Sequence, residues 1–205
     1  MRILIVDDHA VVREGVRQLL SRLPNVEIFS ASDGREAVTE FWKSKPAIVI
    51  LDIDLGGSSG LELLHRLRAQ SKATRAIVFS MHANPGYVVR AIRAGAIGYV
   101  SKSAPAEELV EAVKQASRGQ KYIDRELAGT LVFSTNQADD PYLKLSDREV
   151  EILRLLGDGK SLAQMAATFG VAYKTVANSC SLLKTKLGLE RTADLIRLSI
   201  ERRDK

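Results

Sequence analysis

Short β-branched runs alternate with longer helical patterns over the first 120 residues, and this alternation constrains the fold more than any other feature. The apolar runs lie at residues 3–6 (ILIV), 26–29 (VEIF), 47–51 (AIVIL), 76–79 (AIVF) and 97–100 (IGYV). Continuous apolar runs separated by helices are typical of parallel strands buried on both faces. The sequence therefore predicts an α/β domain built on a five-stranded, doubly wound parallel sheet.

The pattern changes after Gly119, where the fifth helical segment ends. Residues 121–133 can form a short connecting helix, and residues 134–143 are polar, contain a proline and have no apolar period, as linkers do. We expect a domain at 1–120, a connecting helix and linker at 121–143, and a second domain at 144–205.

The second domain has the pattern of a small all-α bundle. The sequence SDRE at residues 146–149 is a capping box that opens a first helix. A short helix over 161–170 ends at a glycine, and a longer one spans 172–188. A short helix, a tight turn and a second helix have helix-turn-helix spacing, and residues 190–203 supply a last amphipathic helix.

Charge and composition narrow the range of partners. The formal net charge is +5, of which residues 144–205 carry +4, from 12 Lys+Arg against 8 Asp+Glu. This excess favours an anionic partner such as nucleic acid, although ordinary solvated helix faces explain it equally well. The single cysteine excludes an intramolecular disulfide framework, and no apolar stretch approaches the ~20 residues of a membrane span. The N-terminus lacks a signal-peptide pattern, so we expect a cytoplasmic protein with no membrane partner.

Three acids end apolar runs that become neighbouring strands. Asp7 and Asp8 follow the first run and Asp52 follows the third. In the usual strand order of such sheets, strands one and three are adjacent, and ligands bind outside their carboxyl ends. Converging carboxylates repel one another unless a cation joins them, and an oxygen-only ligand set suits Mg²⁺.

The remaining strand ends supply groups for phosphoryl chemistry. A carboxylate beside Mg²⁺ can attack a phosphoryl donor, and the hydroxyl of Ser80 and the ammonium of Lys102 can each hold a phosphoryl oxygen. Each residue alone has a simpler explanation, since a strand-end Asp is often a helix cap. Five such positions together favour a phosphoacceptor site.

These residues resemble the receiver domain of a two-component response regulator, and the whole chain resembles the NarL/FixJ class, with a LuxR-type domain that carries LSDREVEILRLLGDGKS and KTV…KLG. The resemblance implies a transcriptional regulator controlled by a sensor histidine kinase, which binds double-stranded DNA and forms a homodimer on activation. It implies the following residues: Asp52 as phosphoacceptor, Asp7, Asp8, Asp52 and the Asp54 carbonyl as metal ligands, and Ser80, Tyr99 and Lys102 as phosphoryl-binding and switch residues. Phosphorylation is then expected to draw Ser80 and Tyr99 inward.

Two positions in the receiver depart from the family pattern. Leu55 and Gly56 stand where many receivers carry Met-Pro, and Ser103 stands where many have a proline in a cis bond. A looser loop after Asp52 would alter the phosphoryl lifetime, and the isomer of the Lys102–Ser103 bond stays open.

The helix over 172–188 has one apolar and one polar face. Its apolar stripe consists of Val176, Cys180, Leu183 and Leu187, which makes Cys180 a core residue rather than a redox sensor. The other face is short, polar and basic, as a major-groove helix should be, and our candidate DNA contacts are Lys174, Thr175, Asn178, Ser181 and Lys184. Asn178 is the candidate base reader, because Asn suits the adenine edge.

Two other functions compete with this interpretation. A phosphatase or phosphotransferase on the same sheet would need a substrate-enclosing cap, and no insertion is long enough to form one. A regulator acting through protein contacts alone is kept open by Ala177 and Ser179, which stand where a basic residue and a His are frequent in the family. His9, His65 and His82 show no metal-ligand spacing and are expected at the surface or beside ligands.

Overall fold

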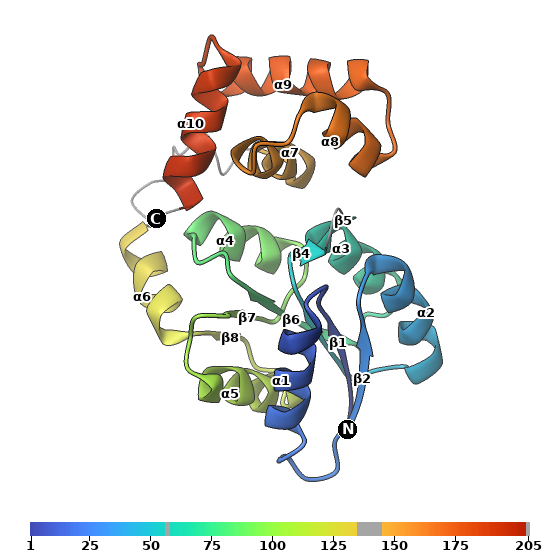
Figure 1. Ribbon diagram of the computed structural model, residues 1–205. Helices are drawn as coiled ribbons and strands as arrows, with labels where there is room; N and C mark the ends of the chain where they lie inside the picture. Colours follow the sequence, from blue (N-terminus) through green and yellow to red (C-terminus); the bar gives the residue numbers. More distant parts are fainter. Residues whose placement is uncertain (56–57, 135–144, 204–205) are drawn as a thin grey trace. The chain divides into compact units, whose positions relative to one another are not determined.

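The computed structural model describes residues 1–55, 58–134 and 145–203, which belong to two compact units, Met1–Ser134 and Thr135–Lys205. The first unit contains a parallel sheet with the strand order β2-β1-β3-β6-β7-β8 (Figure 1). Its strands are β1 (Arg2–Val6), β2 (Glu27–Ala31), β3 (Ile48–Leu51), β6 (Arg75–Ser80), β7 (Gly98–Ser101) and β8 (Tyr122–Ile123). The doubly wound parallel sheet is confirmed, with β1 paired directly to β3.

The sheet has six strands rather than the five predicted. The additional strand, β8, lies within the segment 121–133 that the sequence assigned to a helix, and the helix itself, α6, covers only Arg125–Ser134. The backbone N–H of Tyr122 donates to Ile97 O at 3.0 Å, and that of Asp124 donates to Tyr99 O at 3.1 Å. These bonds satisfy the open edge of β7, because an edge strand carries backbone groups that need partners.

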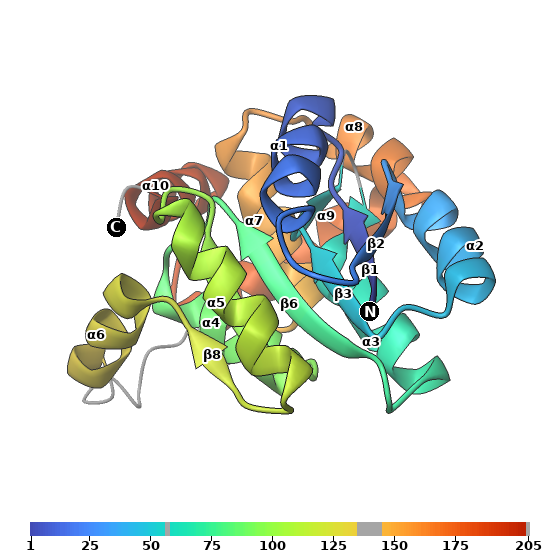
Figure 2. The ribbon, with the colours of Figure 1, turned by 90° about the horizontal axis from the view of Figure 1, so that it is seen from below.

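Helices cover both faces of the sheet. Helices α1 (Ala10–Leu20) and α5 (Ala106–Ser117) lie on one face, and α2 (Gly34–Ser44), α3 (Gly60–Gln70) and α4 (Pro85–Arg93) lie on the other (Figures 1 and 2). Burying an aliphatic side chain contributes about 1.5–3 kcal/mol, so the sheet interior is the main source of stability. The buried cluster between the sheet and the first of these helix layers includes Ile3, Ile5, Val16, Leu20, Ile48, Ile50, Ile77 and Leu109.

A short hairpin follows β3 at the carboxyl edge of the sheet. It pairs β4 (Asp54–Leu55) with β5 (Ser58–Ser59) in antiparallel register. Gly60, at the start of α3, donates its N–H to Ile53 O at 2.8 Å, and a Cβ at this position would collide with the carbonyl oxygen of Asp52. Glycine here lets the helix start directly against the end of β3.

The second unit contains four described helices: α7 (Asp147–Gly157), α8 (Leu162–Phe169), α9 (Tyr173–Leu187) and α10 (Thr192–Arg203). The predicted capping box at Ser146 and Glu149 is confirmed. Gly170 ends α8 with φ +62°, a backbone conformation that glycine adopts without strain. Helices α8 and α9 thus form the predicted helix-turn-helix.

The apolar stripe of α9 packs into this unit largely as the sequence indicates. Val176, Cys180 and Leu183 are buried, whereas Leu187 is partly buried near the end of the helix. Burial raises the pKa of the Cys180 thiol, which fits a core residue. Across the described ranges, no helix combines the length and apolar composition needed to cross a bilayer.

Candidate functional site

The carboxyl ends of β1 and β3 bring the predicted acids together. Asp7, which directly follows β1, and Asp52, which follows β3, are 2% and 4% exposed, respectively. The backbone N–H of Asp52 donates to Val6 O at 2.9 Å, which extends the pairing of the two strands to the site. Strand adjacency therefore places two carboxylates side by side in a nearly closed environment.

Lys102 supplies the positive charge between these acids. Its Nζ lies 2.5 Å from Asp52 Oδ2 and 2.6 Å from Asp7 Oδ2. Burial alone would lower the pKa of Lys102, but hydrogen bonds to Asp52 and Asp7 and the charges of both carboxylates together raise it. Lys102 is thus a fixed cation. For Asp52, burial is the dominant effect, and its pKa is raised even though Lys102 opposes the shift.

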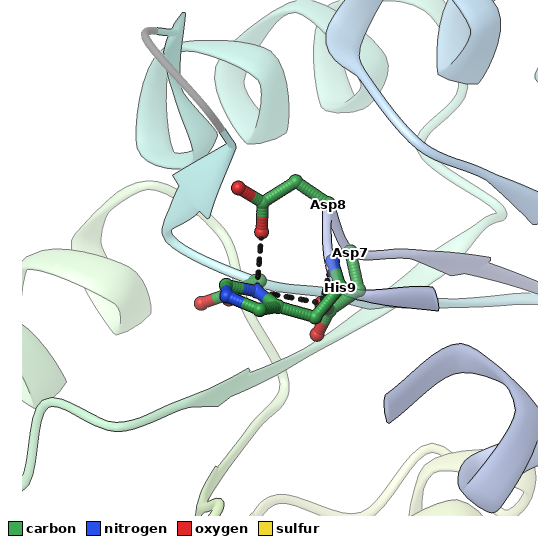
Figure 3. A group of neighbouring side chains, drawn as sticks. Asp7, Asp8 and His9 are labelled. Atoms are coloured by element: carbon green, nitrogen blue, oxygen red, sulfur yellow. Dashed lines mark hydrogen bonds and ion pairs between the residues drawn. The ribbon is translucent and has the colours of Figure 1, made fainter. Parts of the chain in front are cut away.

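Asp8 and His9 complete the charged cluster at the edge of the site. Figure 3 shows the Asp8 carboxylate directed at the ring of His9, whose Nδ1 lies 2.7 Å from Asp8 Oδ1. The His9 backbone N–H donates to Asp7 Oδ1 at 2.8 Å. One ligand atom from each of Asp7, Asp8, His9 and Asp52 lies within 4.8 Å of the others. Because three of these four donors are carboxylates, the cluster is compatible with Mg²⁺ binding.

Ser80 ends β6 and has no exposed surface, and its backbone carbonyl is hydrogen-bonded to the backbone of Lys102. The Lys102 N–H donates to Ser80 O at 2.8 Å, which fixes the relative position of the two strand ends. Among the described residues there is no cis peptide bond, so the Lys102–Ser103 bond is trans.

Tyr99 on β7 is fully buried, and its hydroxyl donates to His82 O at 2.6 Å. Burial, followed by the charges of Asp52 and Asp54, raises the pKa of Tyr99 well above its usual value. The phenol therefore remains a hydrogen-bond donor. The structure thus places this side chain inside the fold in the unmodified chain.

His82 is the residue of this site that sequence reasoning underestimated. Its Nε2 lies 2.9 Å from Asp54 Oδ2, and its backbone N–H donates to Ser80 Oγ at 3.3 Å. Its ring stacks on Tyr87 of α4, with 4.2 Å between centroids. His82 therefore joins the hairpin after Asp52, the Ser80 hydroxyl and α4. No sequence motif signals these contacts, because they depend on side-chain direction.

The two other histidines lie at the surface, which is one of the two placements expected from the sequence: His9 is largely exposed and His65 is exposed.

The predicted DNA-contacting residues lie on the outward surface of α9. Lys174, Thr175, Asn178 and Ser181 are exposed, and Lys184 is partly exposed. Two further hydroxyls bond back to the helix, Ser179 Oγ to Thr175 O at 3.0 Å and Thr185 Oγ1 to Ser181 O at 3.2 Å. This surface differs from the receiver site in the burial of its charged side chains, none of which is buried.

Comparison with known proteins agrees with both parts of the chain. Residues 3–114 match the response regulator receiver domain, and residues 143–199 match the bacterial regulatory proteins of the luxR family. The transcriptional activator protein ExaE of Pseudomonas putida is 36% identical over 98% of this chain and 96% of its own length. The oxygen regulatory protein NreC of Staphylococcus aureus is 32% identical over 99% of this chain and 98% of its own length.

Solved structures give the same result. A two-component response regulator of the LuxR family from Aurantimonas sp. SI85-9A1 is 34% identical, with a TM-score of 0.64 over 66% of this chain and 98% of that chain. The RcsB response regulator of Salmonella typhimurium has a TM-score of 0.81 over 98% of both chains, and its 21% identity shows a shared fold. The chain therefore belongs to the two-component response regulators of the LuxR family, and it is a DNA-binding regulator of transcription rather than an enzyme.

Proposed function

We propose that Asp52 accepts a phosphoryl group from a phosphohistidine of a sensor kinase. The observation that carries this proposal is the Asp52 carboxylate itself, which ends β3, is nearly buried, and has Lys102 Nζ 2.5 Å from its Oδ2. A cation fixed beside an acceptor oxygen is suitably placed to stabilise charge on an incoming phosphoryl group.

The transfer exchanges one bond to phosphorus for another. An oxygen of Asp52 forms the O–P bond, the N–P bond to the kinase histidine breaks, and the released imidazole nitrogen takes up a proton. Lys102 then donates to a phosphoryl oxygen, and the Ser80 hydroxyl donates to another. Asp7, Asp8 and Asp52, with the Asp54 carbonyl, would hold Mg²⁺, which supplies positive charge against the negative charge of the phosphoryl group.

Phosphorylation with a small phosphodonor such as acetyl phosphate tests this assignment. The wild-type chain is expected to gain one acid-stable, hydroxylamine-labile phosphoryl group, and Asp52→Asn is expected to gain none. Asp33→Asn serves as a matched control, because Asp33 is an exposed acid that caps α2 away from β3. Normal phosphoryl incorporation into Asp52→Asn would contradict the proposal.

The proposed output is dimerisation triggered at Ser80. Because the Tyr99 ring is already buried, the change begins when the Ser80 hydroxyl turns to the phosphoryl group and away from the His82 N–H. This releases the segment that leads into α4 and favours a homodimer. A modification shifts such a balance only by its differential free energy, so the unmodified chain dimerises weakly as well. Sedimentation with and without a phosphoryl mimic tests this, and equal dimerisation constants would contradict it.

We further propose that the outward surface of α9 enters the major groove of double-stranded DNA, with the dimer spanning half-sites about one helical turn apart. Lys174 and Lys184 reach flanking phosphates, Thr175 adds a hydroxyl contact, and Asn178 and Ser181 face the base edges. A protein that binds DNA must reach it, so we expect the chain to act in the cytoplasm.

Salt dependence tests the phosphate contacts. Lys184→Ala is expected to weaken binding to all sequences similarly and to reduce the salt slope by about one. Arg197→Ala is the control, because Arg197 is an exposed cation on α10. The competing function, regulation through protein contacts without sequence-specific DNA binding, rests on Ala177 and Ser179, and it predicts no preferred sequence when phosphorylated protein is offered a pool of random duplexes.

A further inference from the structure

The outward surface of α9 differs in charge from the rest of its unit. The sequence of α9, YKTVANSCSLLKTKL, contains three lysines and no carboxylate, and one of the three, Lys186, pairs with Glu149 of α7. By contrast, α7 and α10 both carry acids, and α8 carries no charged residue. A helix with cations and no anions is complementary to the phosphates on both sides of a DNA groove.

Leu182 is an exposed aliphatic side chain on this polar surface, and Tyr173 at the start of the helix is also exposed. Leu182 is 62% exposed. Single exposed leucines are normal on protein surfaces, so the position of this one matters rather than its exposure. Leu182 lies four residues after Asn178 and three before Thr185, and these spacings place all three side chains on one face of the helix. Asn178 and Thr185 are both exposed.

Core packing does not account for this leucine. The inner face of α9 is already formed by Val176, Cys180 and Leu183, all of which are buried. The adjacent Leu183 has no exposed surface, so the two consecutive leucines point in different directions. An exposed leucine on the face that carries Asn178 is free to contact the same ligand as Asn178.

We propose that Leu182 is a specificity-determining residue that contacts the C5-methyl group of a thymine in the half-site. This inference rests on the proposed entry of α9 into the major groove. Four helical residues advance about 6 Å, whereas successive base pairs lie about 3.4 Å apart. The contacted thymine therefore lies within about two base pairs of the adenine that Asn178 reads. Apolar contact with the thymine methyl is one of the means by which the major groove is read.

A protein partner is the less favoured occupant. An exposed leucine can also join two copies of this chain, but the lysines that flank it on α9 would then repel across a symmetric contact. α9 itself carries no acid, and Lys186 is already paired with Glu149 of α7. The repulsion would therefore come from Lys174 and Lys184. Charge complementarity thus favours DNA.

Uracil substitution provides a direct test. The phosphorylated full-length chain is first used to select its preferred duplex from a random pool. Each thymine of a half-site is then replaced in turn by uracil, which lacks only the methyl group. Wild-type affinity is expected to fall about fourfold at one position, since burying one such group contributes ≈ 0.8 kcal/mol. On the thymine site, Leu182→Ala is expected to bind more weakly than the wild-type chain by about the same factor. On the uracil site, the variant and the wild-type chain are expected to bind with equal affinity.

Two variants make the outcomes distinguishable. Ile200→Ala is the matched control, because Ile200 is a 47% exposed aliphatic residue on α10, and it should leave the uracil effect unchanged. If Asn178→Ala loses discrimination but Leu182→Ala retains the full uracil effect, the inference is wrong while the proposed function stands. If neither Asn178→Ala nor Leu182→Ala alters DNA binding, the entry of α9 into the groove is itself wrong. A change in dimerisation of Leu182→Ala without DNA would assign the residue to a protein contact and overturn the inference.

Discussion

The receiver site and the outward surface of α9 are both polar, but they are held in place by opposite means. In the receiver, Asp7 and Asp52 are buried, the Lys102 side chain is 9% exposed, and the three fix one another through contacts of 2.5–2.6 Å. On α9, Asn178 and Ser181 project from a helix whose opposite face is anchored in the core. Function and stability are therefore coupled in the receiver and largely separate on α9.

The largest effect on stability is expected at Lys102. In buffer without divalent cations, Lys102→Met leaves two buried carboxylates with no cation between them and should lower the free energy of unfolding by about 3 kcal/mol. Urea unfolding followed by fluorescence is suitable, because the only tryptophan of the chain, Trp42, lies on α2 in the same unit. A loss below about 1 kcal/mol would contradict the coupling of charge and stability at this site.

Asp52→Asn is expected to act in the opposite direction. Burial raises the pKa of Asp52, so the folded state takes up the proton at a higher pH than the unfolded chain does. Wild-type stability therefore declines as pH rises through the folded pKa, and Asn removes this cost. The variant should be more stable than the wild-type chain at pH 7. The gain should vanish below the unfolded pKa of ~3.9, where both states are protonated. An equal gain at both pH values would rule out this linkage.

A smaller effect is expected in the second unit at Glu149. Its carboxylate caps α7 and pairs with Lys186 of α9 at 2.7 Å, although half of the Lys186 side chain is exposed. Burial acts to raise the pKa of Glu149, but Lys186 and Ser146 lower it overall. The ionised form therefore stabilises the fold at neutral pH, and this contribution is lost as pH falls through the folded pKa.

Glu149→Gln tests this pair, because Gln preserves the capping box and removes the charge. The expected loss is about 0.5 kcal/mol at pH 7 and low salt, measured by amide hydrogen exchange of α7 in the full-length chain. The loss should shrink in high salt. An unchanged loss in high salt would mean that the pair does not act through its charges.

The smallest effect on stability is expected at Asn178. Asn178→Ala should change the free energy of unfolding by less than about 0.5 kcal/mol, because the side chain is exposed. The same change should reduce discrimination for the preferred DNA site by ~1–3 kcal/mol. Thermal unfolding and competition binding measure the two quantities, and a large loss of stability would break the proposed separation of fold and function on α9.

The sheet and the acid cluster were accessible from the sequence because both follow from strand order. Apolar runs marked the positions of β1, β3, β6 and β7, and parallel pairing brings their carboxyl ends to one edge. The short strand β8 was not accessible, because a two-residue element has no periodicity and forms only through pairing with β7. The hairpin of β4 and β5 was missed for the same reason.

Side-chain direction accounts for the other omissions. The sequence placed His82 shortly after a strand end, but its contacts with Asp54 and Tyr87 depend on the turn that precedes α4. The Tyr99 hydroxyl likewise bonds to the His82 carbonyl, which lies in the segment between β6 and α4. On α9, the apolar period identified Val176, Cys180 and Leu183 correctly, but it gives no sign that Leu182, next to the buried Leu183, is exposed.

The most direct test of the account is the DNA affinity of the full-length chain before and after incubation with a phosphodonor, measured in parallel for wild type and Asp52→Asn. We predict that phosphodonor strengthens wild-type binding to the selected duplex and leaves Asp52→Asn unchanged, because only the former carries an acceptor carboxylate at the end of β3. An equal response of both proteins, or a wild-type chain that is phosphorylated without any change in DNA affinity, would contradict the claim that Asp52 controls the α9 surface.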